Sequence, residues 1–265
     1  MNLNQPEPQM EPRSPEDSRL GAGERLTNFL NQYRHLAWSV VIATSLVVFL
    51  AVLPDYIRAA LLSGLLAQGL LATMLFFFSL LALSLLWSNG ERVDVWAFLY
   101  INVRGTRPLW LDWIMLGLTQ LGNGIAALAV ALVLFFSRDR RLAYELILGT
   151  LTLWLVVELV KAMVHRARPF VSLIQTRIIG YRASGLSFPS GHTSQAFFLV
   201  TLLVQHYPIS FWAIALLYLV AAWVGLTRMY VGAHYPRDVL AGAILGSVWG
   251  VLGGIIDARF LTGTG

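Results

Sequence analysis

The amino-acid sequence predicts an all-α fold, a polytopic helical bundle embedded in a membrane. Hydrophobic residues make up 57% of the 265 positions and charged residues only 12%, whereas roughly 25% of the residues in soluble domains are charged. The apolar residues are gathered in runs long enough to cross a bilayer, which takes about 20 residues of helix. These runs fill nearly all of the chain after residue 35. We therefore expect one integral membrane domain built from helices.

Charge distribution and residue types exclude several classes of function. The formal net charge of +5 comes from arginines near the ends of the apolar runs. No basic stretch is interleaved with aromatic residues as a nucleic-acid surface requires, so nucleic acid is not an expected partner. The chain contains no cysteine. Disulfides, thiolate catalysis and thiolate metal sites are therefore excluded.

Composition divides the chain into four parts. Residues 1–35 are rich in Pro, Glu, Arg and Ser and lack apolar periodicity, which predicts a disordered N-terminal tail. Residues 36–61 contain an apolar run, 36–53, that is just long enough for an extra N-terminal span, followed by a loop. Residues 62–258 are expected to form the main membrane domain, and residues 259–265 a C-terminal tail.

Six spans are expected after that first run. The earliest covers about residues 60–87 and is long enough to cross the membrane at a tilt. Residues 89–107 mix charged side chains with aromatic ones, which favours a short interfacial helix and a loop. The other spans are expected over residues 109–136, 142–164, 192–206, 211–227 and 239–256.

The last expected span carries a stripe of glycines at every fourth position, namely Gly242, Gly246, Gly250 and Gly254. Such a smooth face lets another helix come close. We expect this face to pack inside the bundle, and a homodimer is the alternative.

A short basic loop, Arg138 to Arg141, predicts the orientation of the bundle. The positive-inside rule is strongest for short loops next to spans, so this loop is expected on the cytoplasmic side. The next helix crosses the membrane and brings Lys161 to the extracytoplasmic side. Alternation of the later spans brings three separated stretches to that same face. Seven spans would leave the basic N-terminal tail outside, so whether the run 36–53 crosses stays open.

The first of the three stretches closes a span with Lys161, Arg168 and Pro169. A cation inside a membrane span is costly unless it faces a polar cavity. Lys161 and Arg168 are about two helical turns apart, so we expect both on one side of one helix, which Pro169 ends. A fixed pair of cations suits a phosphate group. A basic anchor at the end of a span has the same composition and is the alternative.

The second stretch, Ser187 to Ser194, ends a loop and begins an apolar helix. Ser190 is a good N-cap residue, and the backbone N–H groups of Ser190, Gly191 and His192 are expected to point toward an anion. Gly191 lets a ligand approach the backbone. An ordinary capped helix would explain the serine and the glycine but not His192.

The third stretch runs from Thr227 to Asp238, between the last two spans. It places Arg228 at a span end and His234 in the turn. Asp238 follows in the first turn of the next helix, which Pro236 is suited to begin. A carboxylate bonded to one imidazole nitrogen fixes the tautomer and leaves the other nitrogen free to attack. A polar hairpin between two helices is the alternative.

Together the three stretches resemble the signature of the type 2 phosphatidic acid phosphatase superfamily, membrane lipid phosphatases and their relatives. That signature is Lys, six residues, Arg-Pro; then Pro-Ser-Gly-His; then Ser-Arg, five residues, His, three residues, Asp. Only the hydroxyl residue before Arg228 departs from it, with Thr227 in place of Ser. The resemblance covers about residues 62–258, including Thr119 to Gly122. It implies a six-span phosphatase core, to which the run 36–53 is an addition.

The resemblance also implies a role for each residue. His234 is then the nucleophile that takes the phosphoryl group, Asp238 orients it, and His192 is the general acid. Phosphoryl transfer needs mainly positioning and charge stabilisation, which the remaining residues are suited to supply. A single carboxylate is too little for a magnesium or two-metal site, so no metal or other cofactor is expected. The expected phosphate-binding residues are Lys161, Arg168, Ser190, Gly191 and Arg228.

The expected partners are a phosphorylated lipid substrate and membrane lipids. Isoprenyl diphosphates, phosphatidylglycerol phosphate, phosphatidate and lipid A phosphates all suit a site at the outer membrane face, and the sequence does not choose among them. Two alternatives are a vanadium-dependent haloperoxidase, whose relatives resemble soluble proteins, and a non-enzymatic lipid transporter or flippase, which would not need both histidines and Asp238. Five other basic residues are weaker candidates, expected at the rim of the site: His165, Arg166, Arg177, Arg182 and Arg237.

Overall fold

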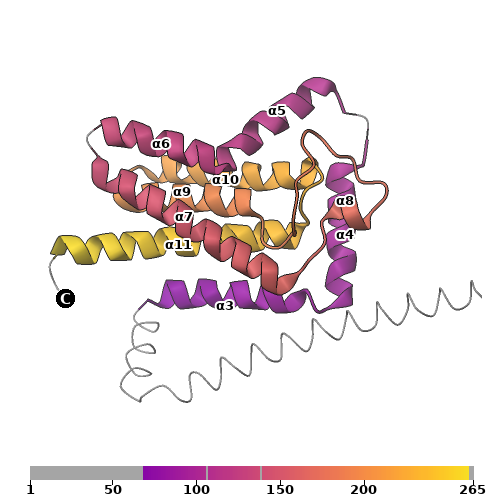
Figure 1. Cartoon of the computed structure of the whole chain (residues 1–265), viewed down its shortest axis with the longest axis horizontal. Coiled ribbons are helices and arrows are strands. Elements are labelled where there is room, and N and C mark those ends of the chain that lie inside the picture. Colours follow the sequence, from indigo (N-terminus) through magenta and orange to yellow (C-terminus); the bar gives the residue numbers. More distant parts are fainter. Residues whose placement is uncertain (1–67, 106, 138, 263–265) are drawn as a thin grey trace, which may run out of the picture. The chain divides into compact units, whose positions relative to one another are not determined.

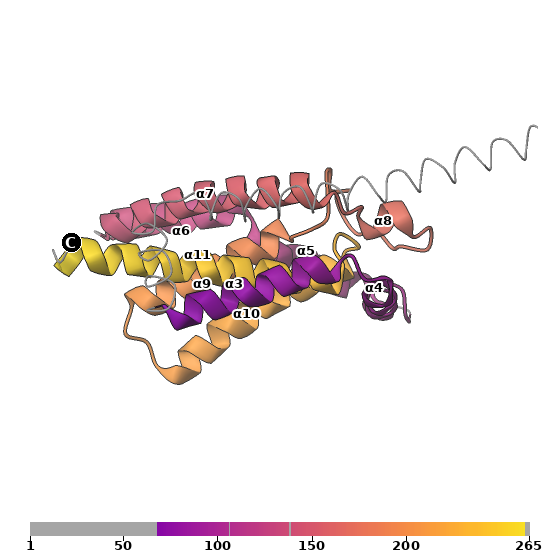
Figure 2. The same ribbon diagram turned by 90° about the horizontal axis from the view of Figure 1, so that it is seen from below.

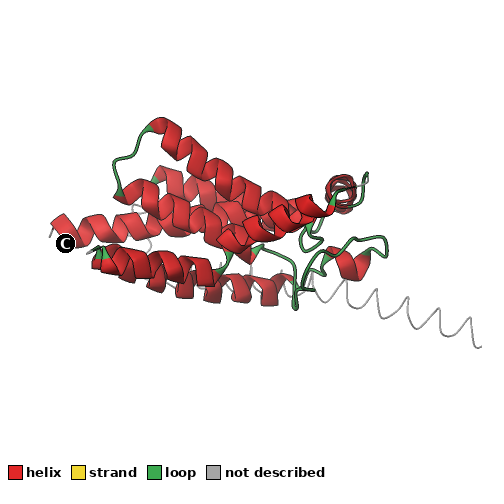
Figure 3. Cartoon of the chain, turned by 90° about the horizontal axis from the view of Figure 1, so that it is seen from above, coloured by secondary structure: helices red, strands yellow, loops and turns green. Residues whose placement is uncertain are grey.

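The computed structural model describes residues 68–105, 107–137 and 139–262. Every regular element in these ranges is a helix (Figure 3). The described helices belong to one compact unit, Leu61–Gly265. The predicted all-α fold class is therefore confirmed.

Several predictions concern residues outside the described ranges. They include the disordered tail over residues 1–35 and the extra span and loop over residues 36–61, as well as Arg138 of the basic loop. These stay predictions. At the other end of the chain the last helix continues to Thr262, beyond the expected end of the membrane domain at residue 258.

The helices follow one another in a simple order (Figure 1). They are α3 (Gly69–Ser84), α4 (Ser88–Asn102), α5 (Leu109–Thr119), the short 3-10 helix η1 (Gln120–Gly122), α6 (Gly124–Phe136), α7 (Arg140–Val164), α8 (Pro169–Ser172), α9 (Gly191–His206), α10 (Phe211–Tyr230) and α11 (Pro236–Thr262). Among the described residues, α7, α10 and α11 are long and apolar enough to cross a membrane by themselves. Two bent pairs raise the number of candidate spans to five. The expected span over residues 192–206 corresponds to α9, whose 16 residues are fewer than the roughly 20 of a full crossing.

The first bent pair is α3 with α4, whose axes differ by 95°. In Figure 1, α4 accordingly lies across the end of the bundle instead of continuing α3. This agrees with the interfacial helix expected over residues 89–107. One charged residue of α4, Asp94, is only 2% exposed. This helix therefore places a carboxylate inside the bundle.

The span expected over residues 109–136 is broken instead of continuous. The axes of α5 with η1 and of α6 differ by 60°. The break lies at Asn123, whose backbone is extended and whose side chain caps α6 by accepting a hydrogen bond from the amide of Ile125 at 3.3 Å. Gly122 just before it packs on α9, where an added Cβ would lie 2.4 Å from the carbonyl oxygen of His192. The break therefore brings this segment against the start of α9.

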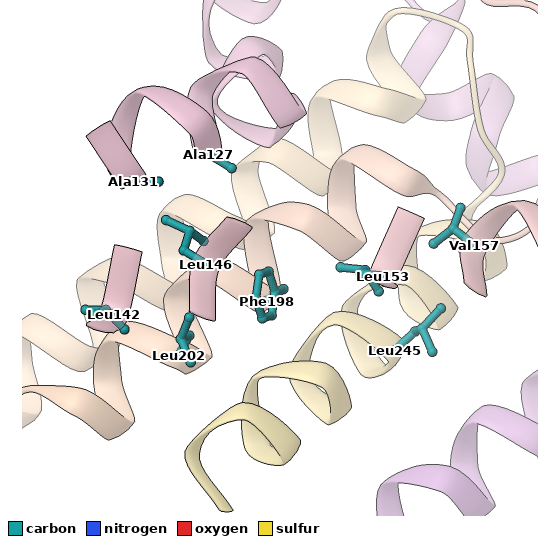
Figure 4. Close-up of a cluster of buried hydrophobic side chains, with 9 residues drawn as sticks. All are labelled: Ala127, Ala131, Leu142, Leu146, Leu153, Val157, Phe198, Leu202 and Leu245. Carbon is teal, nitrogen blue, oxygen red and sulfur yellow. The ribbon is translucent and has the colours of Figure 1, made fainter. Parts of the chain in front are cut away.

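The main hydrophobic core lies where α6, α7, α9 and α11 meet (Figure 4). Phe198 of α9 is almost completely buried in it and packs over Gly149 of α7, where a Cβ would lie 2.3 Å from the ring. Because lipid tails are as apolar as these side chains, the cluster stabilises a membrane bundle mainly through close van der Waals packing. The cluster consists of Ala127, Ala131, Leu142, Leu146, Leu153, Val157, Phe198, Leu202 and Leu245.

The glycine stripe of α11 packs on α9 within the same chain. A Cβ at Gly246 would lie 2.1 Å from the carbonyl oxygen of Ser194, and one at Gly242 would lie 2.6 Å from that of Ser190. The expectation that the stripe packs inside the bundle is therefore confirmed. Because no side chain separates the two backbones, the start of α9 is held directly against the first turns of α11.

These contacts bring four helix ends together at one end of the bundle. They are the C-termini of α7 and α10 and the N-termini of α9 and α11, which all lie on the α4 and α8 side in Figures 1 and 2. The opposite end holds Asp139, which caps α7 and accepts hydrogen bonds from His206 at 3.1 Å and Tyr207 at 2.7 Å. The convergence of the three sequence stretches, predicted from the alternation of spans, is thus confirmed.

Candidate active site

Lys161 and Arg168 reach the site from different segments, which corrects the expectation of one shared helix. α7 ends at Val164, because His165 adopts a left-handed conformation with φ of 52°. Arg168 is extended, since the residue before a proline avoids the helical region, and Pro169 begins α8 instead of ending α7. Lys161, still on α7, forms an ion pair with Glu158 at 2.8 Å.

Arg168 is 5% exposed and is held by backbone carbonyls. Its guanidinium donates to the carbonyl oxygens of Gly185 at 3.0 Å, Ser184 at 2.9 Å and Ala233 at 3.2 Å. One of its nitrogens, Nη1, also lies 3.2 Å from Nε2 of His234. The cation is therefore fixed in place directly beside one ring nitrogen of this histidine.

His234 is 2% exposed, and its two ring nitrogens have different surroundings. Nδ1 lies 2.8 Å from the carbonyl oxygen of Ser187, which only accepts, so Nδ1 carries the proton. Nε2 is then unprotonated and accepts from Arg168. The expected acceptor was Asp238, but its Oδ2 lies 3.7 Å from Nδ1, beyond hydrogen-bond distance. A main-chain carbonyl therefore fixes the tautomer, and Asp238 faces the ring as a nearby charge.

Burial lowers the pKa of His234 from 6.5 to about 4, because a buried imidazolium loses its hydration. The positive charges of Arg168 and Arg228 act in the same direction, while Asp238 opposes them. The ring is therefore neutral near pH 7. A neutral ring whose Nε2 carries no proton is the form that can attack phosphorus.

Asp238 is completely buried in the first turn of α11, where the sequence predicted it. Its Oδ2 accepts from the backbone amide of Tyr235 at 2.8 Å and from the hydroxyl of Ser187. Its Oδ1 accepts from Arg166 at 2.5 Å. Both carboxylate oxygens thus have fixed partners, which hold the charge on the Nδ1 side of His234.

The start of α9 supplies Ser190, Gly191 and His192. Ser190 occupies the N-cap position but makes no capping hydrogen bond, and its amide donates to the carbonyl oxygen of Asp238 at 2.9 Å. That amide is therefore not open to an anion, contrary to expectation. The first intrahelical bond of α9 comes from Ser194. The amides of Gly191 and His192 precede it and have no intrahelical acceptor.

Arg228 is 7% exposed at the end of α10. Its Nη1 donates to the hydroxyl of Thr119 at 2.7 Å. Its Nε is buried without a hydrogen-bond partner in the described part of the chain. Leaving a charged donor unpaired is costly, about 1–3 kcal/mol or more. An anion's oxygen in the site would satisfy it, which fits a phosphate-binding role.

A cavity of about 480 Å³ lies against this end of α7 and α9. Lys161, Gly191 and His192 line it. It continues along α7 as far as Leu146, which is about 22 Å at 1.5 Å per residue. Its other lining residues are mainly apolar, and Leu128 and Trp154 among them are more than half exposed. A polar head thus adjoins a long apolar groove that opens on the side of the bundle.

Four partners of these residues were not singled out from the sequence. Ser187 and Thr119 belong to the sequence motifs but have no predicted contact, Asp94 lies outside the motifs, and Arg166, expected at the rim, bonds to Asp238. Asp94 had no usable signal, because an acid in a helix that mixes charged and aromatic residues is expected at the surface, and its burial appears only in the structure. The main-chain role of Ser187 had none either, because any residue has a carbonyl group.

Comparison with known proteins identifies relatives that are named as phosphatases of phosphorylated lipids. The family model described as PAP2 superfamily matches residues 142–256. The chain is 39% identical over 113 residues to lipid A 1-phosphatase of Rhizobium etli, covering 40% of this chain but only 46% of that protein. It is 28% identical to undecaprenyl-diphosphatase of Sulfolobus acidocaldarius, covering 60% of this chain and 74% of that protein. It is 31% identical to phosphatidylglycerophosphatase B of Bacillus subtilis, covering 53% of this chain and 72% of that protein.

Solved structures agree. The crystal structure of a transmembrane PAP2 type phosphatidylglycerolphosphate phosphatase from Bacillus subtilis matches with a TM-score of 0.62 and 26% identity, over 71% of this chain and 96% of that one. Aquifex aeolicus LpxE matches with a TM-score of 0.54 and 29% identity, over 61% and 94%. The predicted resemblance is therefore confirmed, and the chain belongs to the PAP2 superfamily.

Proposed function

We propose that this protein is a membrane lipid phosphatase that works through a phosphohistidine at His234. The observation that carries the proposal is the state of this ring. Its Nδ1 is held as a donor by the carbonyl of Ser187, and its Nε2 lone pair faces the guanidinium of Arg168 at 3.2 Å. A nucleophile aimed at a phosphate-binding cation is the arrangement that phosphoryl transfer requires.

In the first half-reaction Nε2 of His234 attacks phosphorus, and the bond between phosphorus and the lipid oxygen breaks. His192 donates a proton to that oxygen, so the lipid leaves as an alcohol or a lipid monophosphate. In the second half-reaction His192 takes a proton from a water molecule as its oxygen attacks phosphorus. The N–P bond breaks, inorganic phosphate leaves, and both histidines return to their starting states.

The phosphate cradle consists of three cations and the start of a helix. Arg228, whose Nε is unpaired among the described residues, is suited to bind a phosphate oxygen directly. Arg168 is held by three carbonyls and His234, so it acts with Lys161 mainly through its charge. The amide of Gly191 adds a donor at the positive end of α9. A bound anion would give the buried Nε of Arg228 a hydrogen-bond partner. With this much positive charge in place, we expect hydrolysis to need no divalent metal.

The cavity supports a lipid as the leaving group. In an in-line transfer the leaving oxygen lies opposite the nucleophile, on the side of the general acid. His192 lines the polar head of the cavity, and the apolar groove continues from there along α7. A lipid chain in the groove would therefore bring its phosphate to the cradle, and exposed apolar residues at its edge suit entry from the bilayer.

The substrates we propose are an isoprenyl diphosphate, phosphatidylglycerol phosphate, phosphatidate or a lipid A phosphate, in a multi-pass protein of the cell membrane with its active site on the extracytoplasmic face. The test is phosphate release from each of these lipids in detergent by wild type and His234→Ala. We expect one lipid to be preferred and His234→Ala to release no phosphate. Wild-type turnover by His234→Ala would remove the mechanism. No release from any of the four lipids would favour a transporter.

A matched variant separates the two histidines. His192→Ala should also lose turnover with the lipid substrate. With an activated leaving group that needs no proton, however, it should still accumulate acid-labile phosphoenzyme, because His234 is intact. His234→Ala should form none with either substrate. Phosphoenzyme in His234→Ala would assign the nucleophile to another residue.

A further inference from the structure

The carboxylate of Asp238 is tied into a buried group of charges that the proposed mechanism does not use. Arg166 lies between Asp238 and Asp94 and donates to both carboxylates. Its Nη1 is 2.5 Å from Oδ1 of Asp238, and its side chain is 13% exposed. The guanidinium carbon also lies 4.3 Å from the ring centre of Tyr235. Arg166 is thus fixed on three sides.

The far end of this group is anchored on α4. Asp94 accepts from the side chain of Arg237 at 2.6 Å and from its backbone amide at 3.1 Å. Arg237 in turn donates to the carbonyl oxygen of Ser84 at 2.5 Å. Two carboxylates and two guanidiniums therefore form a neutral set, which is what buried charges need to be tolerated. We call this set the brace.

The brace reaches His234 through Asp238. Among the described residues, Arg166 is the cation that bonds to Asp238. The opposite oxygen, Oδ2, lies 3.7 Å from Nδ1 of His234. When Nε2 becomes bonded to phosphorus, the ring gains positive charge that Asp238 stabilises only if it stays ionised and keeps this orientation. Arg166 favours both conditions, because it bonds to the oxygen that faces away from the ring.

We propose that Arg166, clamped by Asp94, is a positioning residue that holds Asp238 ionised and turned toward the phosphorylated form of His234. The inference deepens the proposed function and rests on it. Arg166 does not touch the cradle, so its side chain should affect formation of the phosphoenzyme and leave binding of the lipid unchanged. This assigns a role to α4, whose contribution to the site is Asp94.

The first test is a comparison of kcat and KM for Arg166→Gln. We expect kcat to fall about 10- to 100-fold and KM to change less than about threefold, since the interaction is needed in the transition state and not for binding. Arg166→Lys keeps the charge but cannot reach two carboxylates in a fork, so it should recover part of kcat. Asp94→Asn, which leaves Arg166 in place but loosens it, should lower kcat less than Arg166→Gln does.

A double-mutant cycle distinguishes positioning from a general loss of structure. Rates of phosphoenzyme formation are measured with an activated leaving group for Arg166→Gln, Asp238→Asn and the double variant. If Arg166 acts through Asp238, the double variant is no slower than Asp238→Asn alone. If the double variant is slower than Asp238→Asn by the full factor that Arg166→Gln causes alone, the two residues act independently and the inference is overturned. If Arg166→Gln does not fold, the same cycle with Asp94→Asn decides the question in the same way.

Asp139→Asn is the matched control. Asp139 also accepts hydrogen bonds from partly buried partners, His206 at 3.1 Å and Tyr207 at 2.7 Å, but at the opposite end of the bundle from Asp238. The variant should lower the melting temperature and leave kcat within about twofold of wild type. An equal loss of kcat in both variants would overturn the positioning role. If His234→Ala is inactive while Arg166→Gln has wild-type kcat, the inference fails and the proposed function stands.

Discussion

Replacing Gly122 with alanine should damage catalysis although this residue has no chemical group to contribute. An alanine Cβ there would lie 2.4 Å from the carbonyl oxygen of His192 and 2.7 Å from Cγ1 of Val224. Ordinary contacts begin near 3.4 Å. The oxygen belongs to the backbone of α9 and cannot rotate away. The segments must therefore separate by about 1 Å, as overpacked cores do.

Two parts of the site move with that separation. The carbonyl belongs to His192, the proposed general acid, in the first turn of α9. On the other side, η1 follows Thr119, whose hydroxyl holds Arg228 at 2.7 Å. A displacement of about 1 Å between reacting groups costs roughly 100-fold in rate, and overpacking costs about 1–3 kcal/mol of stability. We therefore expect kcat of Gly122→Ala to fall about 100-fold while the protein still folds.

Gly117→Ala is the control, because nothing lies within 4 Å of a Cβ at this position in α5. Alanine is the better helix former by about 1 kcal/mol, so this variant should be as stable as wild type or more stable, with unchanged kcat. Phosphate release and thermal unfolding are measured for both variants in the same detergent. Turnover of Gly122→Ala within twofold of wild type would refute the reasoning that this close contact positions His192 and Arg228.

Three further predictions follow from the site and the topology. Of two single-cysteine variants, Tyr181→Cys should react with an impermeant reagent in intact cells and Arg140→Cys should not, because the active site is expected on the extracytoplasmic side. Labelling of Arg140→Cys but not of Tyr181→Cys would show the opposite orientation. Hydrolysis should continue in excess chelator and be blocked by vanadate, whose five-coordinate form resembles the transition state, and Arg228→Ala should weaken that inhibition; activity that vanishes with chelator and returns with magnesium would contradict the metal-free mechanism. The depressed pKa of His234, about 4, means that the ring stays neutral as pH falls from 7 to 5 and is protonated only near pH 4. The rate of phosphoenzyme formation with an activated leaving group should therefore show no inflection near pH 6.5, and an inflection there would contradict the assigned environment.

The placement of the site could be predicted because helices that cross a membrane have nearly fixed lengths. Each motif lies at the end of an apolar run, so alternation of the runs decides which ends share a face. The structure brings Lys161, His192, Arg228 and His234 to one end of the bundle on this basis. Pro236 at the start of α11 and the glycine stripe are equally local signals, and both predictions are confirmed.

Other features could not be predicted because they depend on partners far apart in the chain or on the main chain. Nothing near Lys161 indicates that α7 stops at Val164, since His165 reaches a left-handed conformation that is rare outside glycine. The acceptor for Nδ1 of His234 is a carbonyl, which every residue carries. The bond from Arg166 to Asp94 joins residues 72 positions apart, which no periodicity in the sequence reveals.

Two sets of buried charge with opposite properties lie side by side in this site. The brace is neutral, because Asp94 and Asp238 balance Arg166 and Arg237, so it can form before any ligand arrives. The cradle is not balanced. Lys161 is paired with the half-exposed carboxylate of Glu158, while Arg168 is held by uncharged carbonyls and Arg228 by a hydroxyl.

A phosphate supplies the negative charge that the cradle lacks, and its oxygens give the buried Nε of Arg228 a partner. Binding therefore removes both repulsion between cations and an unpaired donor. A neutral lipid headgroup would leave both costs in place. Selectivity for phosphorylated lipids should thus come from the cradle, whereas the apolar groove along α7 can discriminate between lipid chains only by shape and length. Exchanging the lipid chain of a substrate should consequently change KM more than kcat. Removing the Arg228 side chain should lower kcat/KM by a similar factor for every phosphorylated lipid.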